Sequence, residues 1–109
     1  MPLLTRAEEL ILLAIWKLQD DAYCVSIRKK LTAITGDNWS LGSIYMPIER
    51  MVKNGFLTSR ISDSTPERGG RHKRIYALTE KGRKALVRIY SVSSEMWSDV
   101  SILNLEIKK

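Results

Sequence analysis

The first apolar stretch of the chain predicts a helix that is buried on more than one side. Residues 10–16 are all apolar, and Thr5 and Glu8 precede them with the spacing of a capping box. This pattern favours a helix that begins after Thr5 and runs to about Gln19. Because residues 10–16 are apolar on every face of such a helix, it needs cover on two sides.

A second helix is expected over residues 24–35, with Asp20 or Asp21 as its cap and Gly36 as its stop. Its inward positions are Ile27, Leu31 and Ile34, whereas Arg28, Lys29 and Lys30 point outward.

A third helix is expected from the N-cap Ser40 to Asn54, where the pair Asn54 and Gly55 closes it. At 100° per residue its apolar side holds Leu41, Ile44, Tyr45, Ile48, Met51 and Val52. Its opposite side holds Ser43, Met46, Arg50 and Lys53. Pro47 removes one hydrogen bond, so we expect a kink or a late start near Ser43.

The periodicity then changes to that of a β-hairpin, over residues 56–62 and 73–78, with a long loop between them. Thr79 is expected to cap a last helix, which has room to run as one piece over residues 80–107. Its heptad seam consists of Leu86, Ile89, Ser93, Met96, Val100, Leu103 and Ile107. A seam of this kind predicts pairing with a second copy of the chain, as does the apolar first helix.

The resulting order α-α-α-β-β-α predicts a winged helix-turn-helix, a mainly α fold with a small β-hairpin wing (α+β). We expect the DNA-binding domain in residues 1–78 and a long C-terminal dimerisation helix in residues 79–109, the two forming one continuous domain. A length of 109 residues agrees with a single unit.

Charge and composition favour some classes of function and exclude others. The net charge of +6 attracts polyanions such as nucleic acid. The longest apolar run is far shorter than the roughly 20 residues of a membrane span, and no secretory signal is recognised, so a cytoplasmic location is expected. The sequence has one cysteine, Cys24, and one histidine, His72. These two residues are too few for an intrachain disulfide, a metal site or a catalytic set, and no cofactor is expected. Cys24 is expected to be buried and inert.

Candidate DNA contacts fall on two segments. Cations and glycines gather at the hairpin tip and its return strand, at Arg68, Gly69, Gly70, Arg71, His72, Lys73 and Arg74, where they suit a phosphate backbone. On the third helix, Arg50 suits guanine and Met46 a thymine methyl, while Ser43 and Lys53 suit phosphates or base edges. Alternatively, the charges form a solvated face, Arg50 pairs with Glu49 or Glu80, and Met46 fills a packing gap.

The same segments resemble the PadR family of transcriptional regulators. The resemblance lies in residues 41–47 (LGSIYMP), 69–71 (GGR) and 78–82 (LTEKG), in that order. It implies a homodimeric DNA-binding repressor whose C-terminal helix dimerises. The DNA-binding set on the third helix is then Ser43, Tyr45, Met46, Arg50 and Lys53, and the operator is an inverted repeat.

The dimer interface implied by the seam includes Trp97, which lies beside Met96 and Val100. Trp97, Met96 and Trp16 are candidates for a pocket that binds a small aromatic effector, as similar short members of the family suggest. Trp97 as a plain interface anchor and Trp16 as a core residue are the alternatives. The main rival function is a winged helix that binds protein instead of DNA. RNA binding and enzymatic activity are weaker alternatives.

Overall fold

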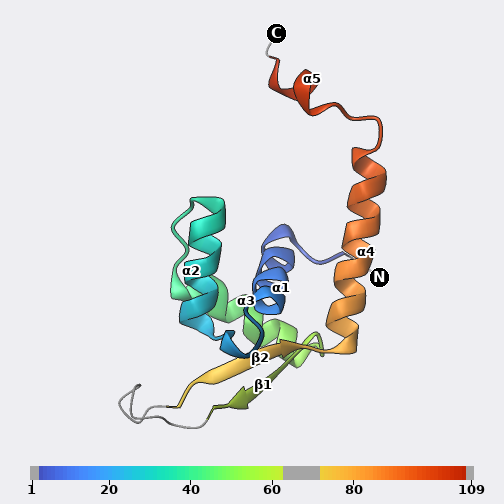
Figure 1. Ribbon diagram of the computed structural model, residues 1–109. Coiled ribbons are helices and arrows are strands. Elements are labelled where there is room, and N and C mark those ends of the chain that lie inside the picture. Colours follow the sequence, from blue (N-terminus) through green and yellow to red (C-terminus); the bar gives the residue numbers. More distant parts are fainter. Residues whose placement is uncertain (1–2, 63–71, 108–109) are drawn as a thin grey trace.

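A computed structural model describes residues 3–62 and 72–107 of the chain. In Figure 1 the helices of residues 6–53 and the hairpin gather into one body, and a long helix rises from this body toward the C-terminus. The elements are α1 (Arg6–Leu18), a short 3₁₀ turn η1 (Gln19–Asp21), α2 (Cys24–Thr35), α3 (Leu41–Lys53), β1 (Leu57–Ile61), β2 (Arg74–Leu78), α4 (Glu80–Trp97) and α5 (Ile102–Glu106). The predicted winged helix-turn-helix is confirmed.

The helix starts follow from local hydrogen bonds. The Glu8 amide donates to the Thr5 hydroxyl and the Thr5 amide donates to the Glu8 carboxylate, so the predicted capping box of α1 is present. The Ser43 amide donates to the Ser40 hydroxyl in the same way at the start of α3. Gly36 and Gly55 adopt the positive φ values of 79° and 87° after α2 and α3, as expected for C-terminal stops.

The start of α2 differs from the expectation, because neither Asp20 nor Asp21 caps it. Both acids lie in η1, and the N-cap is Tyr23. The Ser26 hydroxyl accepts from the Tyr23 amide at 3.0 Å and lies within hydrogen-bond distance of the Asp21 and Tyr23 carbonyl oxygens. The buried Ser26 thus ties the turn to the helix, a role that the acids were expected to fill.

The core is formed by the inner faces of the first three helices and by the hairpin. Its buried members include Ile11, Leu12, Ile15, Ile27, Leu31, Ile44, Ile48, Met51, Leu57 and Tyr76. Ile34, expected inside, is 60% exposed, and Leu41 and Tyr45 are also exposed. All three lie at the edge of an apolar stripe that is wider than the surface available to cover it. The helix α3 starts at Leu41 and continues through Pro47, so the late start near Ser43 was wrong.

The hairpin is antiparallel, with Leu57 opposite Leu78 and Ile61 opposite Arg74. The second edge of β2 is also used, because the Tyr76 amide donates to the Ala22 carbonyl oxygen at 2.9 Å. This bond joins the hairpin to the turn between α1 and α2, and it buries Tyr76 in a strand that was expected to show simple alternation.

The first turns of α4 are seated on the body. Gly82 is buried against the Phe56 carbonyl oxygen, which would lie 2.3 Å from a Cβ at that position. The Thr79 hydroxyl donates to the Gly55 carbonyl oxygen at 2.6 Å and accepts from the Gly82 amide at 3.1 Å. Leu86 packs partly against the core and Ile89 is buried within the chain. These two seam residues are therefore turned toward their own body.

The helix expected over residues 80–107 is interrupted. α4 ends at Trp97, and Asp99 has a φ of 64°, which is a left-handed conformation. The Ser98 hydroxyl donates to the Glu95 carbonyl oxygen at 2.7 Å and so competes with the helical hydrogen bonds. A separate short helix, α5, follows and stands away from the body (Figure 1).

Candidate nucleic-acid interface

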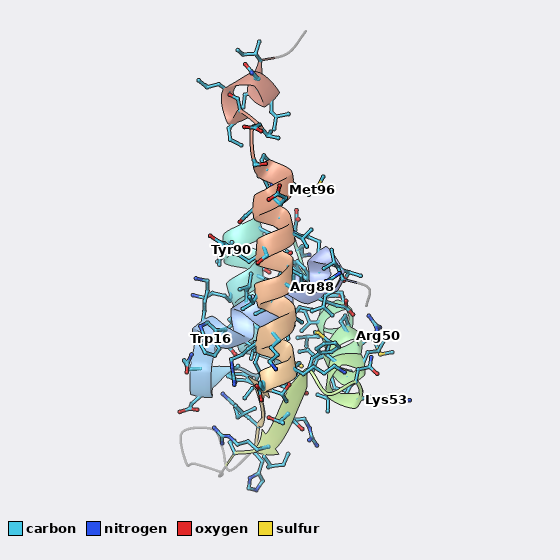
Figure 2. The ribbon with its side chains drawn as sticks, turned by 90° about the vertical axis from the view of Figure 1, so that its right-hand side faces the viewer. Trp16, Arg50, Lys53, Arg88, Tyr90 and Met96 are labelled. Carbon is cyan, nitrogen blue, oxygen red and sulfur yellow. The ribbon has the colours of Figure 1, made fainter. Side chains whose placement is uncertain are left out.

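The outer face of α3 carries the residues that the sequence assigned to it. Ser43, Met46, Arg50 and Lys53 are all exposed, while Ile44, Ile48 and Met51 hold the opposite side in the core. In Figure 2, Arg50 and Lys53 project from α3 on the same side of the molecule. The Ser43 hydroxyl donates to the Ser40 carbonyl oxygen at 2.7 Å, so it reinforces the start of the helix.

Arg50 has an acidic neighbour, but not one of those expected. Its Nη2 lies 3.9 Å from Oε2 of Glu8, on α1, and neither Glu49 nor Glu80 forms this pair. The Arg50 side chain is more than half exposed. The Glu8 side chain is mostly buried, but an ion pair this long with an exposed guanidinium contributes little to stability, so Arg50 can exchange Glu8 for another partner.

The return strand brings its cations beside α3. A hollow of about 230 Å³ is lined by Tyr23, Cys24, Val25, Tyr45, Lys73, Arg74 and Tyr76. Tyr45 comes from α3 and Lys73 and Arg74 from the hairpin, so residues of the two predicted DNA-binding segments meet around one surface. The structure thereby joins two motifs that lie almost 30 positions apart in the sequence.

Contacts within the chain hold the hairpin cations in place. The Nζ of Lys73 lies 3.7 Å from the centre of the Tyr23 ring, a cation–π contact. Nη1 of Arg74 donates to the Ser59 hydroxyl at 3.2 Å. The Nδ1 atom of His72 lies 2.8 Å from the Ser62 carbonyl oxygen. Arg68, Gly69, Gly70 and Arg71 fall outside the described residues.

Tyr23 is the residue of this surface that the sequence analysis missed. Its position as N-cap of α2 places its ring under Lys73 and at the edge of the hollow. The signal available in the sequence was an aromatic residue directly before the first residue of a helix, at a position where no acidic side chain acts as the cap.

The buried end of the hollow is uncharged. Burial raises the pKa of the Cys24 thiol, although a hydrogen bond with Tyr76 acts in the opposite direction. Burial also raises the pKa of the Tyr76 hydroxyl well above its usual value. Cys24 is therefore a protonated thiol at neutral pH, as expected for an inert cysteine, and the cations at the rim supply the charge.

A second surface is apolar and lies where α1 meets α4. Leu13, Trp16, Leu78, Leu86 and Val87 line a groove of about 250 Å³ with Arg83 at the same site. Trp16 and Val87 are exposed, and Tyr90 and Trp97 continue the exposed apolar stripe along α4. The expected seam overlooked Val87 and Tyr90, because it assigned one apolar face to α4 where the structure has two.

The three residues expected to line an effector pocket are not brought together within one chain. Figure 2 shows Trp16 beside the lower part of α4 and Met96 near its upper end. Trp16 lines the α1/α4 groove, whereas Met96 and Trp97 are exposed in the last turn of α4. A pocket that includes all three requires a second chain.

The described residues also limit other kinds of site. Among them, no cluster of three or more His, Cys, Asp or Glu side chains is placed to hold a metal ion. Within the same residues, no helix combines the length and apolarity needed to cross a membrane.

A body of three helices with a hairpin wing and cations beside its third helix defines a winged-helix DNA-binding protein. The family model described as the transcriptional regulator PadR-like family matches residues 11–88. The chain therefore belongs to the PadR-like family of transcriptional regulators, and its class is that of a DNA-binding regulator, not an enzyme. No curated protein matches the chain.

Solved structures agree with this assignment. The chain is similar to a PadR-like transcriptional regulator from Bacillus cereus, with 27% identity, a TM-score of 0.70, and 93% and 92% of the two chains covered. RosR from H. salinarum has 21% identity and a TM-score of 0.71, with 90% of this chain and 81% of that chain covered. A PadR family regulator from Clostridium difficile has 22% identity and a TM-score of 0.62, over 85% and 88%. The last two show the shared fold.

Proposed function

We propose that the protein is a homodimeric repressor that binds an inverted-repeat operator through α3 and the hairpin wing. The observation that carries the proposal is a hollow that both segments line. Tyr45 comes from α3, Arg74 from β2, and Lys73 directly precedes β2. Cations that lie next to α3 suit a duplex whose major groove takes the helix and whose backbone meets the wing.

The individual roles follow from position and chemistry. Arg50 contacts guanine, because its guanidinium is more than half exposed and its ion pair with Glu8 is long. Met46 contacts a thymine methyl, and Ser43, Tyr45 and Lys53 contact phosphates or base edges. His72, Lys73 and Arg74 bind the phosphate backbone together with the segment Arg68, Gly69, Gly70 and Arg71, which is assigned from the sequence.

Dimerisation is supported by apolar surface that the chain leaves open. Trp16 is exposed on α1, and Val87, Tyr90 and Trp97 are exposed on α4. Large exposed apolar side chains on neighbouring elements are typical of a surface that contacts another chain. A two-fold arrangement of two copies buries it and sets two α3 helices at the spacing of one DNA turn, about 34 Å.

Regulation by a ligand follows from the same interface. Trp16 of one copy and Met96 and Trp97 of the other would line a site for a planar aromatic effector. Such a ligand changes DNA affinity only if it prefers one relative orientation of the two winged domains. The bound dimer would act as a repressor by excluding polymerase from the promoter.

The first experiment is binding to the duplex upstream of the protein's own gene, compared with an unrelated duplex of equal length at two salt concentrations. We expect selective binding by a species of twice 12.5 kDa. Equal and steeply salt-dependent binding to both duplexes would show only non-specific attraction. The absence of binding to either would favour the rival function, a module that binds protein.

Two variants assign the contacts. Arg50→Ala should reduce discrimination at one base pair by about 1–3 kcal/mol, whereas Lys73→Ala should weaken binding to all sequences and flatten the salt dependence. Lys84→Ala is the matched control, because it removes an exposed cation that pairs with Glu80 on α4. An equal loss in all three variants would contradict the assignment.

A further inference from the structure

A cavity of about 430 Å³ lies at the junction between the body and the first turns of α4. Phe56, which lies between α3 and β1, lines one side of this cavity. The α4 residues that line it are Glu80, Lys81, Lys84, Ala85 and Arg88. A volume in this range is typical of sites for small organic molecules and is too small for a folded partner.

The cavity faces away from the side of α4 that is proposed for dimerisation. At about 100° per residue, Lys81, Lys84 and Arg88 fall within a sector of about 60° around the helix, and Tyr90 falls almost opposite the middle of this sector. Figure 2 shows Arg88 and Tyr90 on opposite sides of α4. A second copy that packs on the side of Tyr90 therefore leaves the cavity accessible to a ligand.

The described residues that line the cavity combine positive charge with an apolar wall. They include three cations and one acid, so positive charge exceeds negative charge by two. Phe56 and Ala85 are half-buried, and the wall of the cavity is mostly apolar. At neutral pH a phosphomonoester carries a charge of about −1.5 to −2, whereas a carboxylate carries a single charge. A phosphomonoester with an apolar body therefore matches both features of the cavity.

The cations are placed so that they can exchange or share their partners. The Nζ of Lys81 donates to the Asn54 carbonyl oxygen at 2.8 Å and lies 4.6 Å from the centre of the Phe56 ring. An ammonium has three donors, so Lys81 can keep this bond and donate to a phosphate as well. The Nζ of Lys84 lies 3.4 Å from Oε2 of Glu80, and both side chains are mostly exposed. An exposed pair of this kind contributes little to stability, so Lys84 can exchange Glu80 for a ligand.

We propose that this cavity binds a small phosphomonoester whose body is apolar. The three cations hold the phosphate, and the body lies against Phe56 and Ala85. Because Lys81 is bonded to the Asn54 carbonyl oxygen at the end of α3, a ligand held by Lys81 ties the end of α3 to the start of α4. The site is contained in one chain, so it is distinct from the effector pocket proposed for the dimer and does not depend on the proposed function.

Calorimetric titration of the protein without DNA tests the site. The probe is phenyl phosphate, and the comparisons are inorganic phosphate, which lacks the apolar body, and benzoate, which lacks the dianion. We expect one site per chain and a dissociation constant at least about tenfold lower for phenyl phosphate than for either comparison. Equal affinity for inorganic phosphate would show attraction to any anion, and equal affinity for benzoate would show that no dianion is needed. Either result would overturn the proposal.

The same phosphate chemistry occurs in nucleotides and in simpler aryl phosphates, and adenosine monophosphate separates these two sources. The apolar wall favours the aryl phosphate, so we expect the higher dissociation constant for adenosine monophosphate. A lower one would contradict the apolar body and assign the site to nucleotides.

Variants locate the bound ligand. Lys84→Ala should raise the dissociation constant of phenyl phosphate at least about tenfold. Lys29→Ala is the matched control, because Lys29 is exposed on α2, outside the cavity, and should change the constant less than about twofold. Phe56→Leu should weaken phenyl phosphate more than inorganic phosphate, with circular dichroism as the check on folding. An unchanged affinity in Lys84→Ala would place the ligand elsewhere and overturn the proposal.

Binding to the operator separates this inference from the proposed function. The titration contains no DNA, so its failure would leave the repressor proposal intact. A protein that binds phenyl phosphate but no operator would contradict the repressor proposal alone. A Lys84→Ala variant that loses affinity for the operator and keeps its affinity for phenyl phosphate would show that this face of α4 contacts DNA, and would overturn the ligand site.

Discussion

The body of the protein, formed by α1 to α3 and the hairpin, buries its main apolar residues. The C-terminal region, which consists of the second half of α4 and the residues after it, leaves its apolar residues exposed. In the body, Ile11, Ile27, Ile44 and Ile48 have no exposed surface. In the C-terminal region, Tyr90 is 74% exposed and Trp97 is 52% exposed. Both regions contain helices with regular apolar spacing, so the difference does not come from the pattern alone.

The difference shows where the chain supplies its own cover. The body brings three helices and a hairpin together, and the main apolar face of each helix there packs against another element. The second half of α4 and the residues that follow it extend away from the body (Figure 1), and Tyr90, Met96, Trp97 and Leu103 are exposed there in the described structure. The body therefore folds around a core of its own, whereas the exposed apolar side chains of the C-terminal region are the basis for the proposed contact with a second copy.

A core substitution should have the largest effect. Ile48→Ala removes a fully buried side chain of α3, and we expect the free energy of unfolding to fall by about 2–5 kcal/mol. Urea denaturation at a fixed protein concentration measures this change. A loss below about 0.5 kcal/mol would contradict the idea that the body relies on its own core.

A substitution at the junction of the two regions should have a smaller effect. Gly82→Ala places a methyl group against the Phe56 carbonyl oxygen, so α4 must shift on the body. We expect a loss of about 1–3 kcal/mol in the free energy of unfolding. Gly42→Ala is the control, because a Cβ at position 42 meets nothing within 4 Å. Equal losses in the two variants would show that the seat of α4 is not tight.

A substitution in the C-terminal region should affect association more than folding. Tyr90→Ser removes an exposed ring, so the unfolding free energy of the isolated chain should change by less than about 0.5 kcal/mol. The dependence of Tm on protein concentration should become weaker, because a dimer that forms less readily stabilises the fold less. Thermal denaturation over a range of concentrations gives both results. A Tm that is independent of concentration in the unsubstituted chain would contradict the role given to this region.

The smallest effect concerns pH. The pKa of the Cys24 thiol is raised in the folded body from its usual value of 9.0. Above about pH 9 the thiol ionises in the unfolded chain while it stays protonated in the folded one. The contribution of this thiol to the free energy of unfolding should therefore be constant below this pH and fall as the pH rises through it. Cys24→Ala should reduce the slope, and the Tyr76 hydroxyl should leave a remaining slope above pH 10. Urea denaturation from pH 7 to 11 measures both, and a stability that rises with pH would contradict the burial of these groups.

Local patterns in the sequence were enough to determine most of the body. Each of these patterns acts within a few residues: the capping box at Thr5 and Glu8, the helix stops at Gly36 and Gly55, and the change from helical to strand periodicity. The exposed set Ser43, Met46, Arg50 and Lys53 followed in the same way, because the helical period places these residues opposite the core face. Local hydrogen bonds and periodicity depend on neighbours that the sequence itself displays.

Contacts between distant segments decided the rest. Three contacts join segments that no periodicity relates. Glu8 pairs with Arg50, the Tyr23 ring lies against Lys73, and the Ala22 carbonyl oxygen accepts from the Tyr76 amide. Ile34 had the right spacing for burial, yet the described structure leaves it 60% exposed. A sequence pattern shows that a side chain is apolar and which way it points, whereas burial also depends on what the fold places opposite it.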